Sequence, residues 1–86
     1  MIMRPIILLG DPTSAGGQVV QASPATFVEG LAVARAGDAV VCPHGPCAIA
    51  SGDEATLDEG RAVARDGDLT LCGAALLATR TATRIF

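Results

Sequence analysis

The stretch ATFVEGLAVARAGDAVVC, from Ala25 to Cys42, recurs thirty residues later as ATLDEGRAVARDGDLTLC, from Ala55 to Cys72. The two copies align without gaps and share 11 of 18 residues. A shorter third copy precedes them, because GDPTSAG at residues 10–16 matches GDLTLCG at residues 67–73. Internal repeats of this kind indicate supersecondary units that stack or close around an axis.

The residues within and around the repeats favour short strands. Glycines interrupt the chain so often that almost every interval between them is too short for a stable helix, and short apolar segments lie between turn residues. Residues 74–86 lack Gly and Pro, and their Thr-rich end suits a strand at least as well as a helix. We therefore predict a single all-β domain over residues 1–86, with pseudo-threefold internal repeats and tight turns at Gly37-Asp38 and Gly67-Asp68.

The composition excludes several classes of function. The chain has 86 residues, a net charge of −3, 2 Phe, and no Lys, Trp or Tyr. It therefore has neither a basic stripe for phosphates nor an aromatic platform for bases, and nucleic-acid binding is disfavoured. The absence of Lys also excludes Schiff-base chemistry and a P-loop of the usual kind. A domain this small has a thin core, so we expect a metal or a partner to support it.

The sequence carries no targeting signal that we recognise. The apolar run at residues 6–9 is too short for a secretory leader or a transmembrane segment. We expect the chain to be made and folded in the cytosol, where three Cys suit metal ligation or thiolate chemistry better than a disulfide framework.

Each Gly-Asp unit of the repeats carries a carboxylate that invites two interpretations. Asp11, Asp38 and Asp68 all follow Gly, a position where a carboxylate usually caps a turn by accepting a backbone N–H two residues further on. We favour this structural role over a catalytic one. Arg35 and Arg65 are equivalent in the repeats, and the sequence leaves open whether they lie on the surface or pair with carboxylates of a neighbouring repeat.

The residues with metal-binding chemistry gather in CPHGPC, residues 42–47, and at Cys72. Cys42 and Cys72 occupy equivalent repeat positions, so a rotational arrangement brings them, with Ala15, to face one another. Four sulfur and nitrogen donors predict a closed, structural, tetrahedral zinc site, with the ligands Cys42, His44, Cys47 and Cys72. The alternative is a set of buried thiols with a surface histidine, since free Cys is commonly buried.

Two other classes of function remain open. One is a zinc-stabilised regulatory or interaction module, although the acidic charge and the missing aromatics disfavour nucleic acid as its partner. The other is a small hydrolase in which His44 activates a Cys nucleophile. No acid that would orient the histidine is identifiable, which disfavours this second class.

The ordered set of motifs resembles the PAAR-repeat family of type VI secretion spike tips. The resemblance covers nearly the whole chain, and four segments carry it: GDPTSAGG at 10–17, VEGLAVARAGD at 28–38, CPHG at 42–45 and GRAVARDGDLTLCG at 60–73. The Pro-Ala-Ala-Arg of the family name appears in variant form as AVAR, at residues 32–35 and 62–65.

The resemblance implies a small β cone that caps a trimeric valine-glycine-repeat spike protein, one tip per trimer, with zinc near the apex. It implies a structural, membrane-piercing protein rather than an enzyme, secreted with its spike and with effectors as further partners. Because the sequence ends at Phe86, we expect a tip or adaptor rather than a toxin carrier. Candidates for contact with the spike are Ile6, Leu8, Val28 and Ile85.

One position departs from the family pattern. Family members often have His where Ala15 stands, and they usually hold zinc with three His and one Cys. This chain has 1 His and 3 Cys. Cys47 is the obvious replacement for the missing histidine.

Overall fold

Every regular element in the described part of the chain is a β-strand or an isolated bridge. The computed structural model describes residues 4–28, 30–43, 45–79 and 84–85. The strands are β1 (Arg4–Pro5), β2 (Gln18–Val19), β3 (Phe27–Val28), β4 (Leu31–Ala32), β5 (Ala39–Cys42), β6 (Gly45–Ala48), β7 (Asp53–Asp58), β8 (Arg61–Val63) and β9 (Arg84–Ile85). The predicted all-β fold is confirmed, and no helix capable of crossing a bilayer occurs among these residues.

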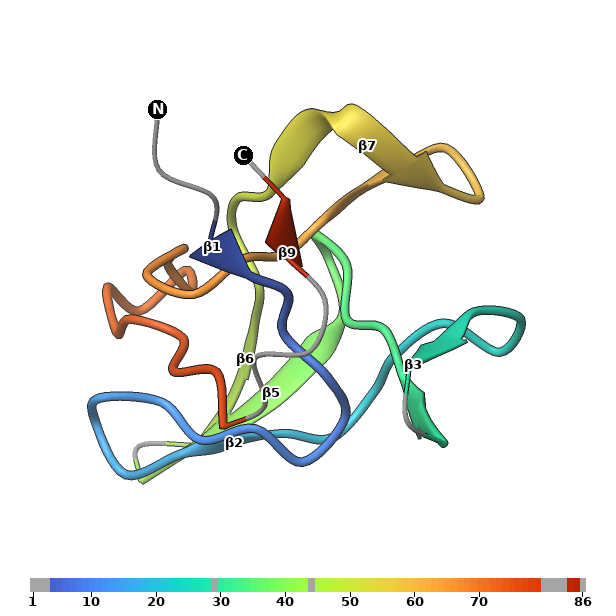
Figure 1. The fold of residues 1–86 in the computed structure, drawn as a ribbon. Helices are drawn as coiled ribbons and strands as arrows, with labels where there is room; N and C mark the ends of the chain where they lie inside the picture. Colours follow the sequence, from blue (N-terminus) through green and yellow to red (C-terminus); the bar gives the residue numbers. More distant parts are fainter. Residues whose placement is uncertain (1–3, 29, 44, 80–83, 86) are drawn as a thin grey trace.

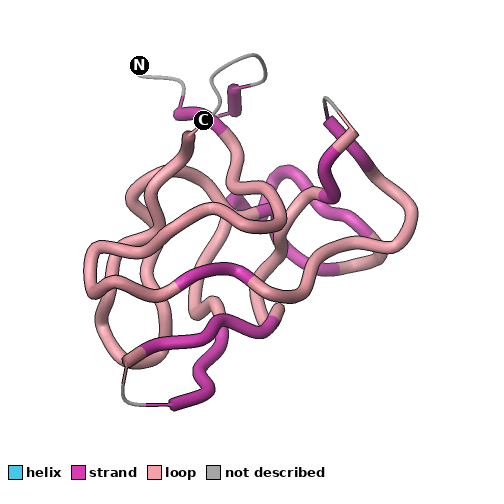
Figure 2. The backbone as a smooth tube through the Cα atoms, turned by 90° about the horizontal axis from the view of Figure 1, so that it is seen from below, coloured by secondary structure: helices cyan, strands magenta, loops and turns pink. Residues whose placement is uncertain are grey.

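The strands form four small antiparallel sheets, with the orders β1-β9, β2-β5-β6, β3-β4 and β7-β8 (Figure 1). Isolated bridges and loops join these sheets into a body of 31 × 28 × 22 Å (Figure 2). The arrangement of several small sheets in one compact body is consistent with the predicted β cone.

Two of the sheets are equivalent ribbons within the thirty-residue repeat. Val28 pairs with Leu31 in β3-β4, and Asp58 pairs with Arg61 in β7-β8. The second ribbon turns through Glu59 and Gly60, whose φ angles of 52° and 79° are those of a type I′ turn. The sheet β1-β9 is a third two-stranded ribbon, but its strands come from opposite ends of the chain.

A closed ring of backbone hydrogen bonds joins three segments at the centre of the molecule. Ile7 N–H donates to Ala64 O (2.9 Å), Ala64 N–H donates to Ala34 O (3.0 Å), and Ala34 N–H donates to Ile7 O (2.8 Å). All three residues are completely buried. The segment around Ile7 therefore corresponds to the two AVAR segments, an equivalence that the sequence indicated only through Gly10 and Asp11.

The three Gly-Asp units adopt the same local structure. Gly10, Gly37 and Gly67 have φ angles of +91°, +90° and +88°, which only glycine adopts readily. Each following aspartate accepts the backbone N–H three residues earlier, at 2.8 Å in every case. The structural role of these carboxylates is confirmed, but the accepted N–H lies before the aspartate instead of two residues after it, because each carboxylate closes the turn that precedes it.

Arg35 and Asp38 form the centre of a buried ionic network. Only 4% of Arg35 and none of Asp38 is exposed. Besides Asp38, Arg35 contacts Asp58 (3.4 Å) and Glu59 (2.7 Å) of the β7-β8 ribbon. Arg35 thus pairs with carboxylates of its own repeat and of the next one, and it ties the β7-β8 ribbon to the centre of the fold.

Small aliphatic side chains fill two core clusters. The larger one contains Ile7, Val19, Ala34, Val40, Cys42, Ile49, Ala64 and Leu76, and the smaller one contains Ile6, Leu8, Val33 and Val63. Ile6 and Leu8, which the sequence offered as contacts for a partner, are therefore core residues. The apolar side chains that do reach the surface of the ribbons are Phe27, 58% exposed, and its repeat equivalent Leu57, 59% exposed.

Candidate metal centre

Three strand and turn segments carry the cysteines to one place. Cys42 is the last residue of β5, and Cys47 lies in the adjacent strand β6. Cys72 lies in the turn after Thr70, and this turn is attached to β6 because Leu71 N–H donates to Ala48 O (2.9 Å). The two halves of the repeat thus meet through the β5-β6 hairpin.

The three sulfur atoms converge closely. The Cys42 and Cys72 Sγ atoms are 3.1 Å apart, and all three Sγ atoms lie within 4.8 Å of one another. Cys42 is buried, Cys47 is half-buried and Cys72 is exposed. Among the described residues, no other group of three His, Cys, Asp or Glu side chains is arranged in this way.

Hydrogen bonds shift the pKa values of Cys42 and Cys72 in opposite directions. The pKa of Cys42 is raised to about 11, first because its thiol is hydrogen-bonded to the Cys72 sulfur and second because it is buried. The pKa of Cys72 is lowered to about 6, chiefly by hydrogen bonds from Thr70 and from Cys42. At neutral pH the pair therefore holds one thiol and one thiolate, and the thiolate is the form that binds metals.

Thr70 is a residue whose role sequence reasoning missed. Its Oγ1 lies 3.0 Å from Cys72 Sγ and accepts the backbone N–H of Ala74 at 3.2 Å. A Cys72 thiolate has no proton to donate, so the Thr70 hydroxyl is the donor to the sulfur in that state. The repeat gave a signal, since Thr70 aligns with Thr13, whose Oγ1 accepts the N–H of Gly17 in the same manner (2.9 Å).

The donor set suits a soft, tetrahedral metal ion. Metal–sulfur bonds of about 2.3 Å place the sulfurs of a tetrahedral site about 3.8 Å apart, so small side-chain movements would bring all three thiols onto one ion. The three cysteines could therefore hold a metal ion. His44, the predicted fourth ligand, belongs to the two-residue connection between β5 and β6 and lies outside the described residues.

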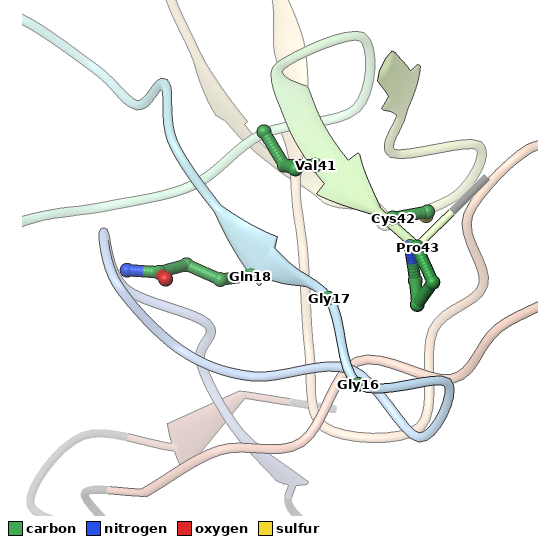
Figure 3. Close-up of a pocket in the computed structure, with 6 residues that line it drawn as sticks. All are labelled: Gly16, Gly17, Gln18, Val41, Cys42 and Pro43. Carbon is green, nitrogen blue, oxygen red and sulfur yellow. The ribbon is translucent and has the colours of Figure 1, made fainter. Parts of the chain in front are cut away.

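A shallow hollow of about 180 Å³ lies beside Cys42 (Figure 3). Its lining residues are Gly16, Gly17, Gln18, Val41, Cys42 and Pro43. Gly17 is required there, because a Cβ at this position would lie 2.1 Å from Val41 O. The hollow is smaller than the roughly 300–1,000 Å³ of typical small-molecule sites. Ala15, the position where the family often has His, is exposed in the turn next to Gly16.

Comparison with protein families gives a match to the PAAR motif over residues 9–78. The chain belongs to the PAAR-motif family. No curated protein sequence matches it closely. The PAAR motif characterises a structural family associated with the type VI secretion spike, rather than a family of enzymes.

The PAAR match contains all three cysteines, both AVAR segments and the three Gly-Asp units. It leaves out both strands of the β1-β9 ribbon, which lie at residues 4–5 and 84–85. The three cysteines that could hold a metal ion therefore lie within the family motif, whereas the β1-β9 ribbon lies outside the matched residues.

Proposed function

We propose that this PAAR protein is the tip of a type VI secretion spike. It caps the blunt end of a trimeric valine-glycine-repeat protein, with one tip per trimer, and sharpens the spike for membrane piercing and effector delivery. The observation that carries the proposal is the PAAR match over residues 9–78. Its partners are the spike trimer and, on loaded spikes, effector proteins.

The metal in this proposal is zinc, held by Cys42, Cys47 and Cys72 with His44 as the fourth ligand. The convergence of three thiols within 4.8 Å supports three of these assignments. Four protein ligands leave no open position for substrate, so the zinc is structural. When bound, it cross-links the β5-β6 hairpin to the turn that contains Cys72.

A mechanical role explains why this small domain needs such a cross-link. A tip has to remain folded while the sheath drives it through a membrane. Structural zinc binds with an apparent free energy on the order of 10 kcal/mol, and the part of it that is realised at the zinc concentration present adds to the stability of the domain. The thiols reinforce the end of the molecule where the β5-β6 hairpin turns.

The surface that contacts the spike is formed by the ribbons at the other end. Figures 1 and 2 show β3-β4 and β7-β8 on the side of the molecule away from the β5-β6 turn. Phe27 and Leu57 are exposed at equivalent positions of these ribbons, which suits a partner with threefold symmetry. The hydrogen-bonded ring of Ile7, Ala34 and Ala64 supports a pseudo-threefold axis, which would match the trimer axis.

The test is co-purification with a trimeric valine-glycine-repeat protein, with the mass of the complex measured by light scattering. We expect one PAAR chain per trimer. The double variant Phe27→Asp/Leu57→Asp should lose binding, whereas Leu71→Asp, a control at a 74% exposed residue beside Cys72, should retain it. A complex with three tips per trimer, or loss of binding by the Leu71 variant alone, would contradict the proposal.

A further inference from the structure

The Cys42 and Cys72 sulfurs lie closer together than two ligands of one zinc ion require. Their separation of 3.1 Å is less than the roughly 3.8 Å between sulfurs of a tetrahedral site. A covalent disulfide needs about 2.05 Å. The pair is therefore positioned between the two states and needs only a small side-chain movement to reach either one.

Backbone hydrogen bonds hold the segments that carry Cys42 and Cys72 close to each other. The strand β5 that ends at Cys42 is bonded along its length to β6. The Cys72 turn is held to the end of β6 by the Ile49–Thr70 bridge and by the bond from Leu71 to Ala48. The segments that carry Cys42 and Cys72 are thus both hydrogen-bonded to β6, and the two cysteines come from equivalent positions in the two copies of the repeat.

The third thiol is placed differently. Cys47 pairs with Val40 across the β5-β6 ladder, whereas Cys42 pairs with Gly45, so Cys42 and Cys47 are diagonal neighbours rather than directly opposed. The Cys47 Sγ is 3.8 Å from the carbonyl oxygen of Ala48, a contact that holds it near its own strand. The Cys42 and Cys72 sulfurs are 3.1 Å apart, and the Cys47 thiol, which lies within 4.8 Å of both, also interacts with each of them.

We propose that Cys42 and Cys72 are a disulfide-forming pair, oxidised by small-molecule disulfides such as oxidised glutathione. Cys72, which is exposed, attacks one sulfur of the oxidant and expels one thiolate. The buried Cys42 then attacks the Cys72 sulfur of the mixed disulfide and expels the second. The protein loses two protons and gains one S–S bond, the oxidant is reduced to two thiols, and Cys47 remains a free thiol.

Disulfide formation and metal binding exclude each other, because the same two sulfurs serve both. This consequence rests on the metal assignment in the proposed function, whereas the disulfide itself rests on the thiol geometry alone. Either bond joins β5 to the turn thirty residues later. The cross-link is therefore kept, by a different bond, when the protein passes from a reducing to an oxidising compartment.

Peptide mapping tests the pairing directly. Metal-free folded protein is incubated with oxidised glutathione, alkylated and digested with trypsin, which separates residues 36–61, with two cysteines, from residues 66–80, with one. We expect the two peptides to be cross-linked, with fragmentation placing the bond at Cys42 and Cys72 and alkylation at Cys47. A bond at Cys47, a lasting glutathione adduct on Cys72, or intermolecular dimers would overturn the proposal.

Variants and zinc loading complete the experiment. Cys47→Ser should still form the link, and Cys72→Ser should form none, including none between Cys42 and Cys47. Zinc loading of the wild-type protein should slow oxidation at least tenfold. If the protein binds no zinc but still forms the disulfide, the metal assignment fails and this proposal stands. If it binds zinc but the metal-free form yields no link, this proposal fails and the metal assignment stands.

Discussion

Replacing Asp38 by Asn removes one charge from the centre of the molecule with almost no change in shape. Asp38 is fully buried, and its two oxygens accept four hydrogen bonds. One oxygen accepts the backbone N–H (2.8 Å) and Nε–H (3.1 Å) of Arg35. The other accepts one N–H from Arg35 (3.1 Å) and one from Arg61 (2.9 Å). In Asp38→Asn, the amide nitrogen replaces one of these oxygens, so two hydrogen bonds become contacts between donors.

The cost follows from this geometry. Hydrogen bonds to a charged group contribute about 1.5–3 kcal/mol each, and breaking a buried ion pair costs about 3–5 kcal/mol. We expect Asp38→Asn to lower the free energy of unfolding by about 3–5 kcal/mol. Since 1 kcal/mol corresponds to about 4–8 °C in a domain of this size, the melting temperature should fall by at least about 12 °C.

The matched control is Asp11→Asn, at the equivalent Gly-Asp unit. Asp11 is also buried, and its carboxylate accepts Leu8 N–H (2.8 Å) and the Thr79 hydroxyl (2.6 Å), but it forms no ion pair with a described arginine. Thermal unfolding of both variants by circular dichroism, in one reducing buffer, provides the comparison. If Asp38→Asn lowers the melting temperature no more than Asp11→Asn does, the arginine pairing adds nothing and the reasoning is refuted.

Two further predictions concern pH and metal removal. The pKa of Asp58 is held below its usual range, first by the hydroxyls of Ser23 and Thr26 and then by Arg35. A depressed carboxyl pKa stabilises the fold above about pH 4 and ceases to do so as the pH falls through the folded pKa. Asp58→Asn should therefore melt below the wild type at pH 7 and approach it at pH 3; an equal gap at both values would count against this. For the metal, zinc at a hundredfold excess over its Kd stabilises by about 2.7 kcal/mol, so a chelator should lower the melting temperature by about 11–22 °C. An unchanged melting temperature would rule out structural zinc.

The repeats made much of the fold predictable from sequence. Alignment of residues 25–42 with 55–72 predicted short strands and Gly-Asp turns, because turn residues impose a local structure wherever they recur. The segment around Ile7 was missed because it has Leu8 where the other copies have arginine, so only Gly10 and Asp11 marked it. The β1-β9 ribbon was not predicted, because pairing between distant segments leaves no local pattern in the sequence.

The candidate site was partly predictable for the same reason. Equivalent repeat positions brought Cys42 and Cys72 together, and proximity in the chain suggested Cys47. Thr70 aligns with Thr13 in the repeat, but the sequence did not predict its role. That role depends on the contact between its hydroxyl and the Cys72 sulfur, which only the structure shows. The sequence likewise could not decide which carboxylates pair with Arg35, because two of them belong to the β7-β8 ribbon, and the packing of that ribbon against Arg35 is not evident from the sequence.

The pairing of β1 with β9 has a consequence for how the chain folds as it is synthesised. Arg4 pairs with Ile85, and the hydrogen bond from Ile7 to Ala64 joins the first segment of the ring to the last. The segment around Arg4 thus has to wait until the segment around Ile85 has been synthesised before its backbone groups are paired, and the loop that closes contains nearly the whole domain. Because contacts of such high sequence separation slow folding, we expect the domain to acquire its structure in one step once the residues of β9 are available, rather than repeat by repeat.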